Sequence, residues 1–213
     1  MAIQGIIFDL DGVIVFTDRL HFRSWQKLAK RLGIPFRKKD NDRLRGVSRL
    51  ASLDILLQGY RGSPFSQQQK EGLAEEKNSY YLSLLAKLTP ADVDPKTRNT
   101  LAELRKRGYR LALGSSSKNA RFILSQVGLA AAFDAIVDGN DIAKAKPDPE
   151  VFLKAAAALG LAPGQCAIIE DAAAGLEAAK AGGMLALGIG PAADCPQADA
   201  RINELSDLLG FPF

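Results

Sequence analysis

The sequence is poor in the residues that build sulfur and nitrogen metal sites or disulfide frameworks. It contains two cysteines, Cys166 and Cys195, and one histidine among 213 residues. Two cysteines are too few for a disulfide framework. Neither has a histidine or second cysteine near it in the sequence, which argues against a zinc site. Cys166 lies in an apolar run, and we expect it to be a small buried residue.

Long apolar runs and long basic runs are also missing. No apolar stretch reaches the roughly 18 residues that cross a bilayer, and the N-terminus lacks the features of a signal peptide. We therefore expect a cytoplasmic protein without a membrane partner. The net charge is +4 and dispersed, and no RNA-binding signature is present, so we expect a small anionic substrate and no nucleic-acid partner. The densest basic stretch, Arg37–Lys39, precedes Asp40 and predicts a solvated loop.

What the sequence does have is an alternation of apolar strands with helical segments. Such alternation predicts right-handed crossovers and a parallel sheet covered by helices, which is an α/β, Rossmann-like fold. The expected strands lie near residues 3–8, 109–113, 133–137, 166–169 and 184–189, and the expected helices near 95–107, 118–127, 149–160 and 172–181.

Between about residues 15 and 91 the strand-like runs vanish. Helices are expected there at 19–32, 48–57 and 67–88. We interpret residues 15–91 as a helical cap domain inserted into a discontinuous core domain of residues 1–14 and 92–213. Two linkers, near 13–17 and 89–93, would form a hinge, and a hinged cap can exclude water from a site. The alternative is one rigid domain.

The first strand ends at Asp9-Leu10-Asp11-Gly12. Side chains two residues apart leave a strand on the same face, so Asp9 and Asp11 are expected to lie close together. Like charges at that distance repel unless a cation lies between them or one group is protonated. The pair predicts a divalent metal with oxygen ligands, a nucleophile beside a proton carrier, or both. The alternative is an Asx turn closed by Gly12.

Polar residues follow two later strands as well, at Ser115–Ser117 and at Glu170-Asp171. Ligand sites in parallel sheets lie beyond the carboxyl ends of the strands. The convergence of three strand ends therefore predicts an active site. Taken singly, these residues have simpler interpretations. The serines are also compatible with a helix N-cap, and Glu170 is compatible with a surface acid. Lys146, which lies between the third and fourth expected strands, is compatible with a solvated surface charge.

With these residues, the chain resembles the haloacid dehalogenase superfamily of phosphotransferases. The resemblance in the core rests on four motifs in order: Asp9-Leu10-Asp11-Gly12, Ser115, Lys146-Pro147 and Glu170-Asp171. Further motifs resemble the phosphosugar mutases of that superfamily more closely. They are Thr17, His21-Phe22-Arg23-Ser24-Trp25, Gly46-Val47-Ser48-Arg49, Ser52-Leu53, Lys77-Asn78, Ser115-Ser116-Ser117-Lys118-Asn119 and Lys146-Pro147-Asp148-Pro149.

The resemblance implies a division of labour in phosphoryl transfer. Asp9 would be the nucleophile that forms an aspartyl phosphate, and Asp11 the general acid and base. Mg²⁺ is the implied cofactor, with Asp9, the Asp11 carbonyl and Asp171 as ligands and Glu170 as a nearby or conditional one. The implied catalytic residues are Asp9, Asp11, Thr17, His21, Ser115 and Lys146.

The resemblance also implies two phosphate sites. Ser115 and Lys146 would bind the transferring phosphoryl group, and residues 117–119 with Arg49 the other phosphate. Two such sites suit a bisphosphate, and β-glucose 1,6-bisphosphate is the implied activating intermediate. The implied substrate-binding residues are Trp25, Gly46, Arg49, Ser52, Lys77, Ser116, Ser117, Lys118 and Asn119.

His21 is implied to couple closure of the cap to the position of Asp11, together with Lys77. Other interpretations stay open, because His21 and Arg49 are compatible with helix-surface residues and Trp25 with a core residue. One departure concerns the hinge, where Phe16 replaces an acidic residue of the family. That replacement leaves the balance between mutase and phosphatase open.

The expected activity is the interconversion of β-D-glucose 1-phosphate and D-glucose 6-phosphate by a monomeric, magnesium-dependent enzyme. One alternative is a sugar-phosphate phosphatase on the same scaffold. Another is a non-catalytic phosphosugar-binding protein, against which the intact Asp9 and Asp11 count.

Overall fold

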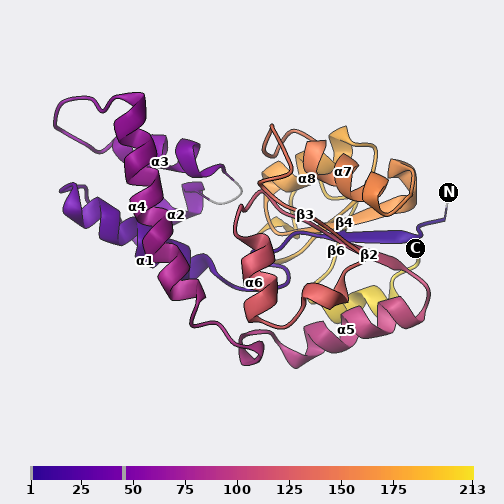
Figure 1. Ribbon diagram of the computed structural model, residues 1–213. Coiled ribbons are helices and arrows are strands. Elements are labelled where there is room, and N and C mark those ends of the chain that lie inside the picture. Colours follow the sequence, from indigo (N-terminus) through magenta and orange to yellow (C-terminus); the bar gives the residue numbers. More distant parts are fainter. Residues whose placement is uncertain (1, 45–46) are drawn as a thin grey trace. The chain divides into compact units, whose positions relative to one another are not determined.

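The computed structural model describes residues 2–44 and 47–213 (Figure 1). Contacts within the chain divide it into two compact units. One unit comprises the segment that ends at Phe16 together with Leu88–Phe213, and the other comprises Thr17–Lys87. We call them the core unit and the helical unit. The domain bounds expected from the sequence, with an insert at 15–91, stay a prediction.

The core unit is built on a parallel sheet that, in the described part of the chain, has six strands in the order β3-β2-β1-β4-β5-β6. The order changes direction at β1, which pairs with β2 on one side and β4 on the other. Such a switch point is where α/β sheets bind ligands. The predicted fold class is confirmed. The strands are β1 (Gly5–Phe8), β2 (Arg110–Gly114), β3 (Ala135–Val137), β4 (Cys166–Glu170), β5 (Leu185–Gly188) and β6 (Ala200–Arg201).

Helices cover both faces of this sheet. In Figure 1, α7 (Glu150–Ala158) and α8 (Ala173–Ala181) lie on one face and α5 (Pro95–Lys106) lies on the other. A shorter helix, α6 (Ala120–Gln126), follows β2. The start of α5 follows from its sequence, because Asp94 Oδ1 accepts the N–H of Lys96 at 2.8 Å and proline occupies the first helical position.

The helical unit consists of α1 (Asp18–Arg31), α2 (Lys38–Asn41), α3 (Arg49–Leu57) and α4 (Gln67–Leu85), as far as the structure describes it. Serine caps begin the last two helices: Ser48 Oγ accepts the N–H of Ala51, and Ser66 Oγ accepts the N–H of Gln69. The apolar faces of these helices form a core of their own. That core includes Trp25, Leu28, Leu53, Leu56 and Leu73.

The structure differs from the sequence prediction at several boundaries. Arg37–Lys39 are exposed, as the prediction of a solvated stretch requires, but the loop assignment is wrong at Lys38 and Lys39, because Lys38–Asn41 form α2. Asp40 closes this turn by accepting the N–H of Arg37 at 2.7 Å. The helix expected from residue 118 begins at Ala120, because serine side chains hold the preceding residues in turns.

Two further differences concern strands at one edge. The strand expected at 133–137 is limited to Ala135–Val137, and β6 was not expected, since two residues carry no periodic signal. Within residues 2–44 and 47–213, none of the helices combines the length and apolar character required to cross a membrane.

Candidate active site

A buried lysine between two carboxylates forms the centre of the candidate site. Lys146 Nζ donates hydrogen bonds to Asp9 Oδ1 at 2.6 Å and to Glu170 Oε2 at 2.7 Å. Asp9 and Lys146 are each 7% exposed and Glu170 is 2% exposed. Burial by itself lowers the pKa of Lys146, but the charges of Asp9 and Glu170 raise that pKa above its ordinary value. Lys146 is therefore a charged, buried group, and the solvated alternative is wrong.

The sheet explains why these groups meet. Asp9 follows β1 and donates its N–H to Ile169 O in the neighbouring β4, at 3.0 Å. Glu170 is the last residue of β4, and Asp171 follows it. Adjacent parallel strands thus deliver their carboxylates to the same edge, and the structure confirms that these two strand ends converge. Asp9, Glu170 and Asp171 each offer an oxygen atom within 4.8 Å of the others.

Gly12 allows Asp171 to lie close to the turn after β1. Gly12 has a φ of +85°, and a Cβ atom at this position would lie 2.0 Å from Asp171 Oδ2. Only glycine combines this backbone conformation with so close an approach. The glycine of the Asp-Leu-Asp-Gly motif therefore has a packing role beside the carboxylates as well as a role in the turn.

Crowding of the carboxylates changes their protonation. Burial, followed by the charges of Asp9, Glu170 and Asp11, raises the pKa of Asp171 to about 8. Burial and Asp9 raise the pKa of Glu170 to about 7 against the opposing effect of Lys146. Burial and the repulsion between neighbouring carboxylates thus raise these pKa values more than Lys146 lowers them, so further positive charge would favour the ionised forms. A divalent ion with a preference for oxygen ligands would supply that charge, so the residues present fit Mg²⁺.

Glu170 differs from Asp171 in that both of its oxygens already have partners. Oε2 accepts from Lys146, and Oε1 accepts the N–H of Ala172 at 3.1 Å. This arrangement favours Glu170 as a residue beside the ion, and Asp9 and Asp171 as its side-chain ligands. The interpretation of Glu170 as a surface acid is wrong, because the side chain is buried.

The serine run lies just beyond the carboxyl end of β2. Ser115 is 2% exposed, and its Oγ accepts the N–H of Ser117 at 3.1 Å. Ser117 Oγ accepts the N–H of Asn119 at 3.2 Å. The serines therefore form turns before α6 rather than its N-cap. Ser116 Oγ is buried and has no hydrogen-bond partner in the described part of the chain.

The helical unit contains a second group of predicted site residues. Lys77 Nζ lies 3.1 Å from His21 Nδ1, and its distances to the Trp25 and Tyr81 ring centres are 4.8 and 4.4 Å. Burial, then Lys77, then Arg49, lower the pKa of His21 well below its ordinary value. His21 is therefore neutral at physiological pH, and its Nδ1 accepts from Lys77. Tyr81 Oη donates to Thr17 Oγ1 at 3.2 Å.

The remaining predicted residues of this unit have varied surroundings. Arg49 Nη1 lies 3.1 Å from Glu75 Oε2, and the Arg49 side chain is 27% exposed. Trp25 is 2% exposed within the helical core, so the core interpretation holds for it. Ser52 is buried on α3, and Gly46 lies outside the described residues.

Sequence reasoning missed two groups of residues. Tyr81, which contacts Thr17 and Lys77, lies one helical turn after Lys77, and this spacing was the available signal. Asp138 and Asn140 follow β3, whose carboxyl end meets the same edge of the sheet as the other three strand ends. Their polar character at a fourth strand end was the signal that could have found them.

Comparisons with known proteins agree with this geometry. The profile of the family described as "haloacid dehalogenase-like hydrolase" matches residues 3–183. A β-phosphoglucomutase of Bacillus subtilis is 42% identical over 206 residues, which are 96% of this chain and 91% of that protein. A phosphorylated carbohydrates phosphatase of Thermotoga maritima is 29% identical over 85% of this chain and 82% of its own length.

A solved structure extends the likeness to the fold. The crystal structure of β-phosphoglucomutase from Clostridium difficile is similar to this chain with a TM-score of 0.90 and 38% identity. The match covers 97% of this chain and 93% of that one.

Proposed function

The chain belongs to the haloacid dehalogenase-like hydrolase family, and from that premise we propose that it is a magnesium-dependent β-phosphoglucomutase. It interconverts β-D-glucose 1-phosphate and D-glucose 6-phosphate through an aspartyl phosphate and β-glucose 1,6-bisphosphate. The likeness to β-phosphoglucomutases over nearly the whole chain carries the proposal. The buried pair of Asp9 and Lys146, with the partly buried Asp171 near Asp9, supports the proposed chemistry.

Asp9 is the proposed nucleophile, which attacks phosphorus and forms the aspartyl phosphate. Lys146 already contacts Asp9 Oδ1, so it is suited to neutralise phosphate oxygens as they gather charge. Mg²⁺, held by Asp9, the Asp11 carbonyl and Asp171, would offset the repulsion between carboxylate and phosphate. Ser115 and the hydroxyl of Ser116 are proposed to bind the transferring group.

Asp11 is the proposed proton carrier. It gives a proton to the leaving sugar oxygen and takes one from the sugar hydroxyl that attacks next, a role that contributes about 10²–10⁴ in rate. His21, with Lys77 and Thr17, is proposed to assist Asp11 when substrate is bound. The non-transferring phosphate is assigned to Ser117, Lys118, Asn119 and Arg49.

A sugar-phosphate phosphatase is the second candidate. Phe16 is 76% exposed and stands where the resemblance implies that the family usually has an acidic residue. One relative is named a phosphorylated carbohydrates phosphatase. The replaced charge adjoins Thr17 in the sequence, so it bears on whether the phosphoenzyme passes its phosphoryl group to sugar or to water.

An assay with pure anomers separates the candidates. The enzyme with Mg²⁺ and a trace of glucose 1,6-bisphosphate receives either β- or α-glucose 1-phosphate, and glucose 6-phosphate formation is coupled to its oxidation. Phosphate release is measured in parallel. We expect product from the β anomer far in excess of released phosphate, and little from the α anomer. Phosphate release that matches or exceeds glucose 6-phosphate formation would establish the phosphatase instead.

A further inference from the structure

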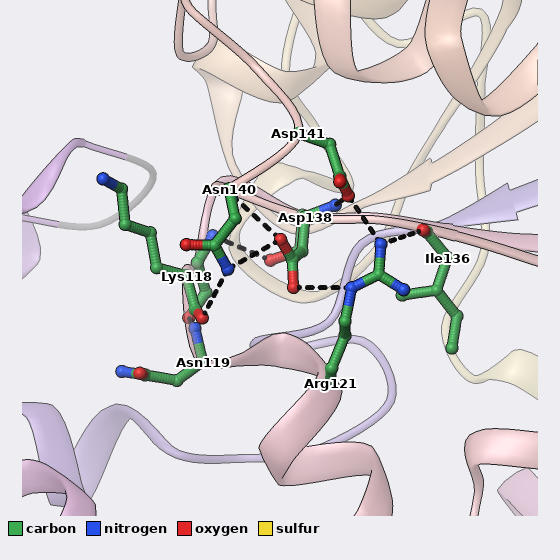
Figure 2. A network of polar contacts seen from close by, with 9 residues as sticks. Lys118, Asn119, Arg121, Ile136, Asp138, Asn140 and Asp141 are labelled. Carbon is green, nitrogen blue, oxygen red and sulfur yellow. Dashed lines mark hydrogen bonds and ion pairs between the residues drawn. The ribbon is translucent and has the colours of Figure 1, made fainter.

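The loop after β3 contacts the backbone of the serine loop, Ser115–Asn119, at consecutive residues. Asn140 Nδ2 donates to Lys118 O at 3.0 Å, and Gly139 N donates to Ser117 O at 3.2 Å. Both acceptors lie in the segment assigned to the non-transferring phosphate. Figure 2 shows Asn140 between Lys118 and Asp138.

Gly139 makes this contact a close one. A Cβ atom on Gly139 would lie 2.4 Å from Ser116 O and 2.9 Å from Lys118 N. Both are backbone atoms, which cannot move aside as the end of a long side chain can. The two loops are therefore packed backbone against backbone, and a change in one loop displaces the other.

The carboxylate of Asp138 holds Asn140 in position for its contact with the serine loop. The Asp138 side chain is fully buried, and Oδ1 accepts from the backbone N–H of Asn140 at 2.9 Å and from the Asn140 amide at 3.0 Å. The Asn140 amide thus joins one buried carboxylate to the Lys118 carbonyl (Figure 2). A buried carboxylate of this kind must be paired or hydrogen-bonded, and Arg121 provides the charge.

Arg121 ties the carboxylates together (Figure 2). Its Nε lies 3.3 Å from Asp138 Oδ2, and its Nη2 donates to Asp141 Oδ2 at 2.7 Å and to Ile136 O at 2.8 Å. Asp141 Oδ2 also accepts the N–H of Asp138 at 2.8 Å. Hydrogen bonds within such a network strengthen one another. The network therefore fixes the loop after β3 relative to α6, which itself follows the serine loop.

We propose that Asp138, Asn140 and Arg121 are positioning residues that hold Ser117–Asn119 in the geometry required to bind the substrate's non-transferring phosphate. The proposal rests on the proposed function, which assigns that phosphate to these residues. None of the three needs to touch the substrate. They act through the backbone of the serine loop, whose displacement by about 1 Å can cost up to about 100-fold in rate.

The kinetic test compares a substrate that has a second phosphate with one that lacks it. Asn140→Ala removes the link to Lys118 O at an exposed position, so the fold is retained. We expect KM for β-glucose 1,6-bisphosphate to rise about tenfold, while kcat/KM for hydrolysis of acetyl phosphate stays within about twofold. An unchanged KM, or an equal loss with both substrates, would overturn the proposal.

Arg121→Ala and Arg105→Ala form a matched pair. Arg105 also binds an aspartate, Asp134 at 2.9 Å, and a carbonyl, Ala131 O at 2.8 Å, but it makes these contacts away from the serine loop. We expect Arg121→Ala to raise KM for the bisphosphate as Asn140→Ala does, and Arg105→Ala to leave it unchanged. Equal effects of the two arginine substitutions would show a general loss of stability and overturn the proposal.

Amide hydrogen exchange in the ligand-free protein tests the positioning role apart from the proposed function. We expect the amides of residues 116–119 to exchange about tenfold faster in Asn140→Ala and Arg121→Ala, and at the wild-type rate in Arg105→Ala. If the wild-type enzyme does not use the bisphosphate, the proposed function fails and this measurement still decides the positioning role. Unchanged exchange in both variants would contradict it.

Discussion

The two units each bury a lysine, and the two lysines are held in different ways. Lys146 of the core unit is 7% exposed and contacts the carboxylates of Asp9 and Glu170. Lys77 of the helical unit is 4% exposed and lies beside the imidazole of His21 and the Trp25 and Tyr81 rings. The first contact surrounds the cation with two carboxylates, one of them the proposed nucleophile, whereas the second adds to burial in lowering the pKa of a histidine. We propose that the residues of the core unit carry out phosphoryl transfer and that those of the helical unit bind substrate and assist it.

Substitution of each lysine by methionine should give the largest difference in activity between the two units. Lys146→Met leaves Asp9 and Glu170 without the cation between them and removes a group suited to neutralise phosphate. We expect kcat for acetyl phosphate hydrolysis to fall by about 10²–10³. Lys77→Met should leave that rate within about threefold, because the residues proposed to carry out this reaction all belong to the core unit. Equal losses of kcat in the two variants would contradict the proposed division of roles between the units.

Arg49→Ala tests the role of the helical unit, and we expect a smaller effect than that of Lys146→Met. The guanidinium is paired with Glu75 and is proposed to bind the non-transferring phosphate. We expect kcat/KM for β-glucose 1,6-bisphosphate to fall about 10–100-fold, in line with the loss of a charged hydrogen bond. Acetyl phosphate hydrolysis serves as the control and should not change. Lys70→Ala, which breaks the exposed ion pair with Asp54 on the same unit, is the matched control variant.

The pH dependence of magnesium binding tests the core carboxylates. Without the ion, the pKa of Asp171 is raised to about 8 and that of Glu170 to about 7. Protons therefore compete with Mg²⁺ below pH 8, and the apparent Kd should fall as pH rises from 6 to 8, by up to about tenfold per unit for each proton displaced. Isothermal titration at several pH values measures this. Asp171→Asn should bind far more weakly, and a pH-independent Kd in the wild type would contradict the crowding of these groups.

The smallest effect that we expect is a change in the pKa of His21, in the helical unit, when Lys77 is substituted. His21 is the one histidine in the sequence, so its ring protons give an unambiguous NMR titration. Burial, Lys77 and Arg49 lower its pKa well below the ordinary value. Lys77→Met removes one of the two cations, and we expect the pKa to rise, by up to about one unit. An ordinary wild-type pKa, or no rise in the variant, would show that Lys77 does not control His21.

The sequence predicted the part of the site that depends on strand ends. Asp9, Glu170 and Asp171 lie at or just after the carboxyl ends of buried strands, and a parallel sheet brings such residues together whatever lies between them. The contact of Lys146 with Asp9 joins residues 137 positions apart. Neither spacing nor the family motif predicted that contact, because the motif implied only that Lys146 binds the transferring phosphoryl group.

Other features depend on contacts that no local pattern records. The burial of Trp25 and its distance from Lys77 follow from how α1 packs against α4. The short helix α2 depends on one side-chain contact of Asp40. The network joins Asp138 and Asn140, which follow β3, to Arg121, which lies at the start of α6. No single sequence motif contains all three residues, so the sequence did not indicate that they contact one another.

The proposed role of Asp9 as the nucleophile is tested most directly by identifying which residue of the enzyme becomes phosphorylated. The protein is treated with Mg²⁺ and ³²P-labelled acetyl phosphate, quenched in acid, digested and analysed by mass spectrometry. We predict one labelled, hydroxylamine-sensitive site at Asp9, and no label in Asp9→Asn, whose amide is not a comparable nucleophile. A label on another residue, or retained in Asp9→Asn, would contradict the assignment of Asp9 as nucleophile.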